Sequence, residues 1–302
     1  MGLGVDFGGT KIEAVWLAED GSEHGRMRVP TPRGDYDASL RAVAELVARV
    51  EAAAGVRGAP VGVGIPGTIA PDSGLVRGGN ATWLSGRAFD RDLAALLDRP
   101  VKVTNDANCF ALSEALDGAG AGAPTVFGVI LGTGVGGGLV IGGRLVEGAN
   151  NVAGEWGHSP LPARSAEELD GPRCFCGRRG CLEVWLSGPA ISADHARVLG
   201  LDRAPAAPEI AAQAAAGDPA ARATLDRHLD RLARSLGWVV NLIDPHVIVL
   251  GGGVSNMDHL YRDLAPRVLP HVMADRAHVE IRRARHGDSS GVRGAARLWE
   301  LP

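Results

Sequence analysis

Three features are missing from this sequence: a long apolar run, a cluster of basic residues and a large number of cysteines. No stretch is long and apolar enough to span a bilayer, and charged residues, Asp6 and Lys11, interrupt the N-terminal segment. Lysine and arginine total 31 against 35 acidic residues, a formal net charge of −4. This balance argues against nucleic acid or an anionic membrane as the main partner. We therefore expect a cytoplasmic protein that acts on a small molecule.

The cysteines suggest a metal site. Four cysteines are too few for a disulfide framework in 302 residues. Three of them, Cys174, Cys176 and Cys181, follow one another closely and come after His158. Three thiolates and an imidazole form a closed tetrahedral Zn²⁺ set, which leaves no open position for a catalytic water. The alternative is a loop with free thiols, because a disulfide between Cys174 and Cys176 would be strained.

The segment 104–108, Thr-Asn-Asp-Ala-Asn, stands where a predicted strand changes into a predicted helix. In an open α/β sheet, ligands usually bind at the carboxyl ends of the strands. Asp106 would place a carboxylate at such an end. The alternative is that Asp106 or Asn105 only caps the helix and satisfies its first backbone N–H groups.

Glycine turns follow three predicted strands. After the first strand, Gly8 and Gly9 allow a phosphate to approach backbone N–H groups, while Thr10 and Lys11 add a hydroxyl and a charge. Asp6 can hold Mg²⁺ directly or through water. An ordinary Gly-Gly hairpin is the alternative for this turn alone.

The second and third turns are at 132–138 and 251–253. The second resembles the N-terminal pattern of strand, Gly-Thr turn and strand, which suggests an internal duplication with a phosphate-binding hairpin in each half. We expect Ser255 or Asn256 to cap a helix after the third turn. Two matches to G-x-G-x-x-G, beginning at Gly62 and Gly132, are not dinucleotide sites, because Pro66 in one case and a strand in the other replace the required helix.

Six blocks of the sequence resemble the ROK (repressor, open reading frame, kinase) family of sugar kinases, in the same order and over essentially the whole chain. They are 6–11 (DFGGTK), 64–67 (GIPG), 105–108 (NDAN), 132–134 (GTG), 154–158 (GEWGH) and the segment from Cys174 to Cys181. The resemblance implies an α/β, two-lobed actin/hexokinase-like fold, a duplicated ribonuclease-H-like unit. It also implies a small lobe at 1–117, a large lobe at 118–288 that carries the zinc site, and a C-terminal helix at 289–302 that returns to the first lobe.

The resemblance further implies a set of site residues. Asp106 would be the catalytic base, and Zn²⁺ would bind His158, Cys174, Cys176 and Cys181. Sugar hydroxyls would contact Asn80, Asn105, Asp106, Glu155, His158 and Glu183. ATP, with Mg²⁺, would contact Gly4, Val5, Asp6, Phe7, Gly8, Gly9, Thr10, Lys11, Gly132, Thr133, Gly134, Val135, Gly136, Gly137, Gly138, Leu139, Gly251, Gly252 and Gly253. Members of the family are commonly homodimers.

Within the family, three segments resemble bacterial fructokinases and mannokinases: 80–86 (NATWLSG), 155–162 (EWGHSPLP) and 286–296 (HGDSSGVRGAA). They favour phosphorylation of the 6-hydroxyl of fructose or mannose. N-acetyl-D-glucosamine or glucose is the alternative substrate. A sugar-responsive repressor is disfavoured because the first hairpin begins at Leu3, without a helix-turn-helix ahead of it, and a non-catalytic sugar-binding module would have no use for three phosphate turns. His286 receives no role.

Overall fold

The computed structural model describes residues 2–287 and 290–300. Asp288, Ser289 and the last two residues of the expected C-terminal helix lie outside the described residues. Contacts divide the chain into two compact units, one made of residues up to 122, 138–154 and from 285 onward, the other of 123–137 and 155–284. Segment 138–154, which we expected in the second lobe, is grouped with the first unit. There, Thr68 Oγ1 donates to Asn151 O (2.9 Å) and Thr104 Oγ1 donates to Glu147 Oε1 (3.2 Å).

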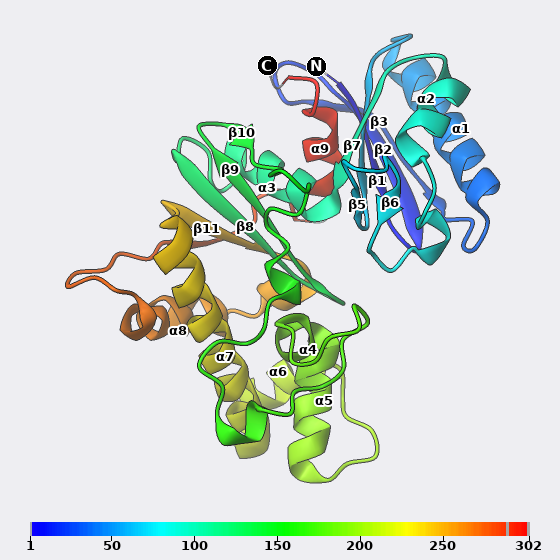
Figure 1. The fold of residues 1–302 in the computed structure, drawn as a ribbon. Coiled ribbons are helices and arrows are strands. Elements are labelled where there is room, and N and C mark those ends of the chain that lie inside the picture. The colour runs from blue at the N-terminus through cyan, green and yellow to red at the C-terminus, as the bar shows by residue number, and fades with distance from the viewer. Residues whose placement is uncertain (1, 288–289, 301–302) are drawn as a thin grey trace. The chain divides into compact units, whose positions relative to one another are not determined.

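The first unit is built on the sheet β3-β2-β1-β4-β7 (Figure 1). Strands β1, β2 and β3 run antiparallel, whereas β1, β4 and β7 are parallel neighbours. A two-stranded sheet, β5-β6, lies beyond β4 in sequence. The strands are β1 Gly2–Phe7, β2 Lys11–Leu17, β3 Glu23–Pro30, β4 Val61–Ile65, β5 Thr68–Ile69, β6 Val76–Arg77 and β7 Val101–Asn105.

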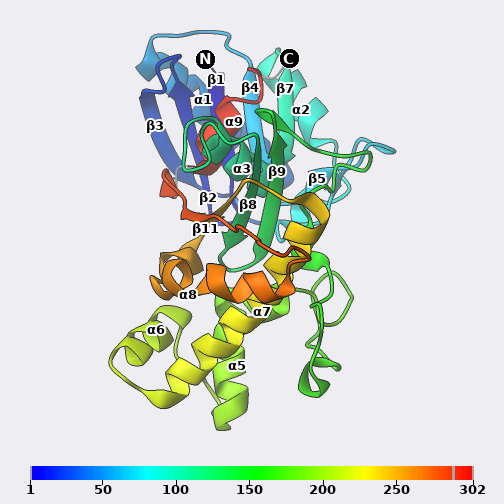
Figure 2. The same cartoon turned by 90° about the vertical axis from the view of Figure 1, so that its left-hand side faces the viewer.

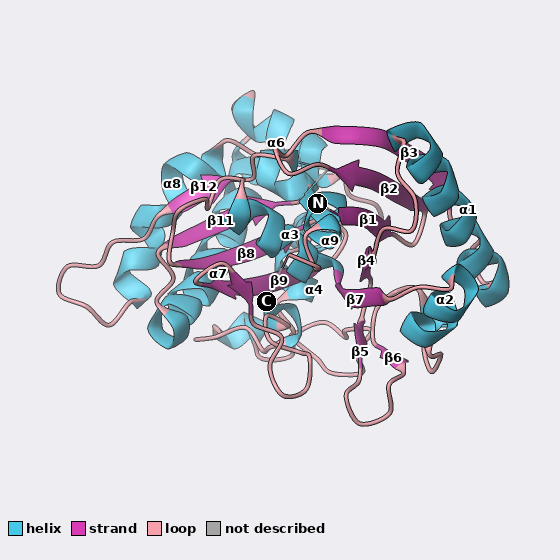
Figure 3. Ribbon diagram, turned by 90° about the horizontal axis from the view of Figure 1, so that it is seen from above, coloured by secondary structure: helices cyan, strands magenta, loops and turns pink. Residues whose placement is uncertain are grey.

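Helices cover both faces of this sheet. Figure 3 shows α1 (Tyr36–Ala54) and α2 (Phe89–Leu97) on one face, and α3 (Asp106–Leu116) with α9 (Ser290–Ala296) on the other. Asp35 caps α1, and a stripe of leucine and valine at helical spacing is buried against the sheet. A 3₁₀ turn at Thr82–Leu84 precedes α2.

The second sheet repeats the order of the first. Its order is β10-β9-β8-β11-β12, so in each sheet the third, second, first, fourth and fifth strands follow one another. The first strand again has a parallel neighbour, since β8 pairs with β11, and β11 with β12. The predicted duplication is therefore confirmed. The strands are β8 Thr125–Leu131, β9 Val135–Ile141, β10 Arg144–Leu145, β11 Val247–Gly251 and β12 Ile281–Arg283.

A group of helices packs together in the second unit (Figure 2). The longest, α7 (Pro219–Ile243), follows its N-cap Asp218, which accepts from Ala221 N (2.7 Å), and is followed by its C-cap Asp244. The others are α4 Glu183–Leu186, α5 Gly188–Leu199, α6 Ala207–Ala215 and α8 His259–Val268, with 3₁₀ turns at Trp156–His158, Ala166–Glu168, Gly253–Asn256 and Leu269–His271. No helix in the described ranges combines the length and apolar composition needed to cross a bilayer.

Glycines let α9 lie directly on the first sheet. A Cβ at Gly62 in β4 would be 1.9 Å from Ala295 O, and a Cβ at Gly294 would be 1.7 Å from Cys109 O in α3. Ser290 Oγ, at the start of α9, also donates to the buried carboxylate of Glu114 (2.7 Å). The C-terminal residues thus complete the core behind α3, the helix that begins at Asp106.

We expect Gly294→Ala to destabilise the first unit. In a helix without such a neighbour this change normally stabilises by up to about 1 kcal/mol, but here the Cβ meets the Cys109 carbonyl, so α9 must move away. Urea unfolding should show a lower midpoint with an unchanged slope. An unchanged or higher midpoint would contradict the close approach of α9 and α3.

Candidate functional site

In the first unit, two carboxylates stand at the same edge of the sheet. Asp6 lies near the end of β1, and Asp106 follows the last residue of β7. Strand β4 runs between them, with Gly64 opposite Asp6 and Ile65 opposite Asn105. All three strands are parallel, so their carboxyl ends meet where a ligand is expected in an α/β sheet.

Asn105 caps helix α3, and Asp106 is the first helical residue. The Asn105 side chain accepts from Ala107 N (2.8 Å) and donates to Gly67 O (3.2 Å). Asp106 Oδ1 also accepts from Ala107 N (2.8 Å). Of the two predicted capping residues, Asn105 therefore performs the role. Asp106 keeps the position at the helix N-terminus, where the helix dipole favours a negative charge.

The surroundings of Asp6 oppose its ionisation. Burial, and next the nearby carboxylates of Asp106 and Glu13, raise the pKa of Asp6 to about 7. Lys11, one of the predicted phosphate contacts, acts in the opposite direction. Two carboxylates at one edge of the sheet suit a divalent cation, since hard cations prefer carboxylate oxygens.

The first glycine turn and Asn80 lie beside each other in this unit. Gly8 N donates to Lys11 O (2.9 Å) and closes the turn, and Thr31 Oγ1 donates to Gly8 O (2.7 Å). A Cβ at Gly9 would be 3.4 Å from Asn80 Oδ1. Asn80, Asn105, Asp106 and the turn residues are thus gathered around the ends of β1, β4 and β7.

We expect Asp6→Asn to stabilise the metal-free protein in a pH-dependent way. Between pH 3.8 and about 7 the unfolded Asp6 ionises while the folded one holds its proton, so wild-type stability falls as pH rises through that window. The gain from the neutral amide should be small near pH 4 and reach a few kcal/mol, roughly, above pH 7. Thermal unfolding across pH measures it. Asp72→Asn, which removes an exposed partner of Arg77, should show no such gain, and an equal gain in both variants would contradict the buried-carboxylate account.

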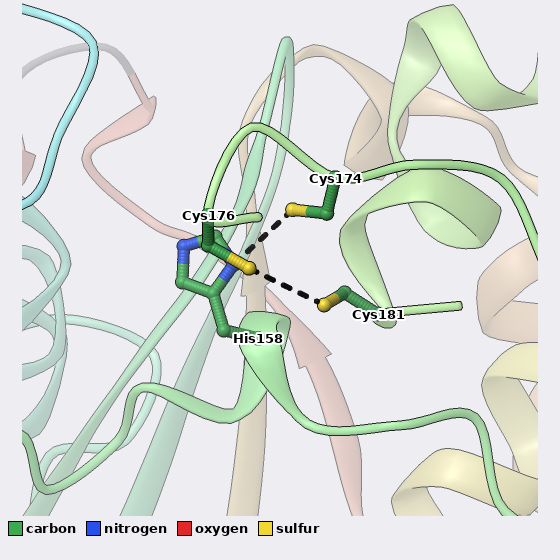
Figure 4. Close-up of side chains that lie close together, drawn as sticks. All are labelled: His158, Cys174, Cys176 and Cys181. Carbon is green, nitrogen blue, oxygen red and sulfur yellow. Dashed lines mark hydrogen bonds between the residues drawn. The ribbon is translucent and has the colours of Figure 1, made fainter. Parts of the chain in front are cut away.

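In the second unit, His158 and three cysteines converge. Figure 4 shows the four side chains pointing toward one another. Their ligand atoms all lie within 4.8 Å of one another. His158 Nδ1 is 3.5 Å from Cys174 Sγ, and Cys176 Sγ is 3.6 Å from Cys181 Sγ. The loop is shaped by Cys174 N donating to Arg178 O (2.8 Å) and Gly177 N to Cys174 O (3.0 Å).

These separations fit a zinc ion. Bonds of about 2.3 Å from Zn²⁺ to sulfur separate two tetrahedral sulfurs by about 3.8 Å. Burial, followed by hydrogen bonding with Cys176, raises the pKa of Cys181 to about 12. Burial also opposes ionisation of Cys176, but hydrogen bonds with the Arg178 backbone and the two neighbouring thiols lower the pKa of Cys176. A free-thiol loop would have no need to gather four ligand atoms in this way.

Three predicted sugar contacts adjoin this cluster. Glu155 precedes the 3₁₀ turn at Trp156–His158, His158 is the last residue of that turn, and Glu183 begins α4. Burial raises the pKa of Glu155, while His158 opposes this shift and Glu183 adds to it. Glu183 Oε2 also accepts from Val135 N (3.1 Å), a contact that no sequence pattern indicated.

The predicted phosphate turns of this unit lie side by side. A Cβ at Gly252 would be 2.5 Å from Leu131 O, at the start of the turn 132–134. Gly253 lines a cavity of 970 Å³ whose walls come from α6, α7 and α8. Ala211, Ala214 and Ala215 form the α6 wall, and the only sequence signal for it was the alanine-rich run itself.

Two sequence interpretations need revision here. Neither Ser255 nor Asn256 caps a helix: both lie in a 3₁₀ turn at Gly253–Asn256, and α8 begins at His259. Ser255 Oγ donates instead to Gly252 O (2.7 Å), because the tight glycine turn brings that carbonyl back. His286, in the first unit, pairs with Asp117 through Nε2 and Oδ1 (2.9 Å).

Comparison with known proteins agrees with this arrangement. Residues 2–301 match the ROK family. An N-acetyl-D-glucosamine kinase from Shigella boydii is 45% identical over 99% of this chain and 99% of its own length. A ROK hexokinase from Thermus thermophilus superposes with a TM-score of 0.85 at 33% identity, covering 97% of this chain and 96% of the other. A ROK glucokinase from Streptomyces griseus, in complex with glucose and AMPPNP, has a TM-score of 0.79 at 29% identity, with 98% of each chain covered.

Proposed function

Since the chain belongs to the ROK family and is a sugar kinase of that family, we propose that it transfers the γ-phosphoryl group of ATP to the 6-hydroxyl of N-acetyl-D-glucosamine. The observation that carries the choice of sugar is the 45% identity, over nearly the whole chain, to a kinase of that name. Phosphorylation of fructose or mannose, which the segments at 80–86 and 155–162 favoured, is the competing prediction.

Asp106 is the general base in this proposal. The sugar hydroxyl attacks the γ-phosphorus, the bond from that phosphorus to the ADP oxygen breaks, and Asp106 accepts the hydroxyl proton. Its place at the start of α3 holds the carboxylate at the strand ends. Asn80 and Asn105 in the first unit, and Glu155, His158 and Glu183 in the second, are proposed to hold the sugar hydroxyls.

The nucleotide is proposed to contact the glycine turns. The segments 8–11 and 132–139 are proposed to contact the phosphates, because the lack of a Cβ at their glycines permits close approach. The cavity beside Gly253 is large enough for an adenosine, since ligand sites commonly measure 300–1,000 Å³, and its alanine wall suits a flat base. Asp6 would hold Mg²⁺, which neutralises phosphate charge in such transfers.

Zinc is proposed as a structural ion on His158, Cys174, Cys176 and Cys181. The Nδ1 atom of His158 is on the sulfur side of its ring, so Nε2 remains for the sugar. A metal there would fix the backbone from which the proposed sugar-binding side chains project. The four protein ligands complete a tetrahedron, so the ion has no direct part in phosphoryl transfer.

The substrate is tested by ADP release with N-acetyl-D-glucosamine, glucose, mannose and fructose in parallel. We expect the highest kcat/KM with N-acetyl-D-glucosamine, and a product that retains a free reducing end. A higher value with fructose would support the competing prediction. Equal values for all four sugars would contradict any selection at the N-acetyl group.

Asp106→Ala should abolish sugar-dependent ADP release, with a loss of kcat of at least about 10²-fold, typical for removal of a general base. The fold should persist, as circular dichroism and thermal unfolding would show. Asp35→Ala is the matched control: it removes a carboxylate that caps α1 in the same unit, so it should lower stability by about 1 kcal/mol without reducing kcat. Appreciable turnover by folded Asp106→Ala would contradict the assignment.

Elemental analysis should find one zinc per chain. Cys181→Ser should lose it, because a hydroxyl is a poor ligand for Zn²⁺, and thermal stability should drop accordingly. Cys109→Ala, in the first unit, should keep full zinc content although it also removes a buried thiol. A stable, active wild-type preparation without metal would contradict the proposed site.

A further inference from the structure

The turn 132–135 is held by one neighbouring segment of the chain. Val135 N donates to Glu183 Oε2 (3.1 Å), and Gly188 N donates to Gly132 O (2.8 Å). Within the turn, Gly132 N donates to Gly134 O (2.9 Å). The first residues of α4 and α5 are therefore hydrogen-bonded to the two ends of the turn.

Gly134 provides the space for the contact with Glu183. A Cβ at Gly134 would be 2.6 Å from Glu183 Oε2, closer than a side-chain carbon can approach an oxygen. The missing side chain thus admits a carboxylate of the protein itself. This role is separate from giving a phosphate access to the backbone.

Glu183 is also tied to the metal-ligand cluster. It is two residues after Cys181, and Val184 N donates to Cys181 O (3.1 Å). Leu182 N donates to Ser159 O (2.9 Å), next to His158. Glu183 Oε1 is 3.9 Å from Cys174 Sγ. Whatever fixes the four ligands therefore fixes the backbone of Glu183.

We propose that Glu183 is a positioning residue that couples the metal-ligand loop to the turn 132–135, and so sets the conformation in which that turn binds the phosphates of the nucleotide. This inference rests on the proposed function in one respect, namely that the ligand of the turn is the phosphate chain of a nucleotide. It adds to the sugar contact a second role for the same side chain: Oε2 serves the turn, while Oε1 faces the cluster and the sugar-binding residues.

Two variants separate the roles. In Glu183→Gln the side-chain carbonyl can still accept from Val135 N, but the negative charge is gone; in Glu183→Ala the acceptor is lost. Loss of a hydrogen bond to a charged group should speed hydrogen exchange of the Val135 amide by about tenfold or more. We expect faster exchange and weaker binding of a non-hydrolysable ATP analogue, measured by calorimetry without sugar, in Glu183→Ala, and near wild-type values of both in Glu183→Gln.

Removing the metal with a chelator should reproduce the Glu183→Ala effects in the wild type. Removing the metal from the Glu183→Ala variant should cause little further change in Val135 exchange or analogue binding, because the effects of two changes that act through the same contact are not additive. Asn241→Ala is the matched control, since the Asn241 side chain also accepts from a backbone N–H of the second unit, that of Met273 (2.8 Å), but does not line the cavity proposed for the adenosine. It should leave Val135 exchange and analogue binding unchanged.

The outcomes separate this inference from the choice of substrate. The coupling is overturned if Glu183→Ala binds the analogue as tightly as the wild type, or if Glu183→Gln and Glu183→Ala weaken analogue binding equally. This holds even when N-acetyl-D-glucosamine is a good substrate. The opposite outcome is that none of the tested sugars is phosphorylated, while Glu183→Ala speeds exchange of the Val135 amide and weakens analogue binding and Glu183→Gln does neither. That outcome supports the coupling and contradicts the proposed substrate.

Discussion

Asp6 and Asp106 place two acidic groups at the carboxyl ends of β1 and β7, with β4 between them. Their mutual repulsion and the burial of Asp6 are unfavourable for the protein alone, and the divalent cation proposed at Asp6 would compensate them. The rest of the first unit preserves this arrangement. Asn105 caps α3 and ties it to Gly67, while α9 covers the opposite side of α3.

Glycine serves two purposes in this chain. At Gly62 and Gly294 it permits backbone packing of α9 against a strand and a helix. At Gly134 it admits the carboxylate of Glu183, and the same turn is proposed to approach phosphate. A glycine-rich motif therefore reports close approach without saying what approaches, because the missing Cβ is equally compatible with a ligand, a carbonyl or a side chain.

The second unit shows how one segment can serve several groups at once. Residues 181–188 contribute a proposed metal ligand in Cys181, a proposed sugar contact in Glu183, and a backbone donor to the glycine turn in Gly188. Helix α4 is only one turn long, so these groups cannot move independently. A displacement of the cysteine side chains should accordingly displace the turn 132–135 as well, because the residues between them form a short rigid segment, and no large conformational change is needed.

By itself the sequence determined the order of the elements, the duplication, the family and the residue types of the site, because periodicity, caps and glycine turns are local signals that the two repeated halves share. It could not decide between Asn105 and Asp106 as the cap, the attachment of Glu183 to Val135, the start of α8 at His259 or the alanine wall of the cavity. These depend on which backbone groups meet across strands and helices distant in sequence. The choice among sugars is equally non-local, since it depends on the three-dimensional arrangement of side chains that are distant in sequence.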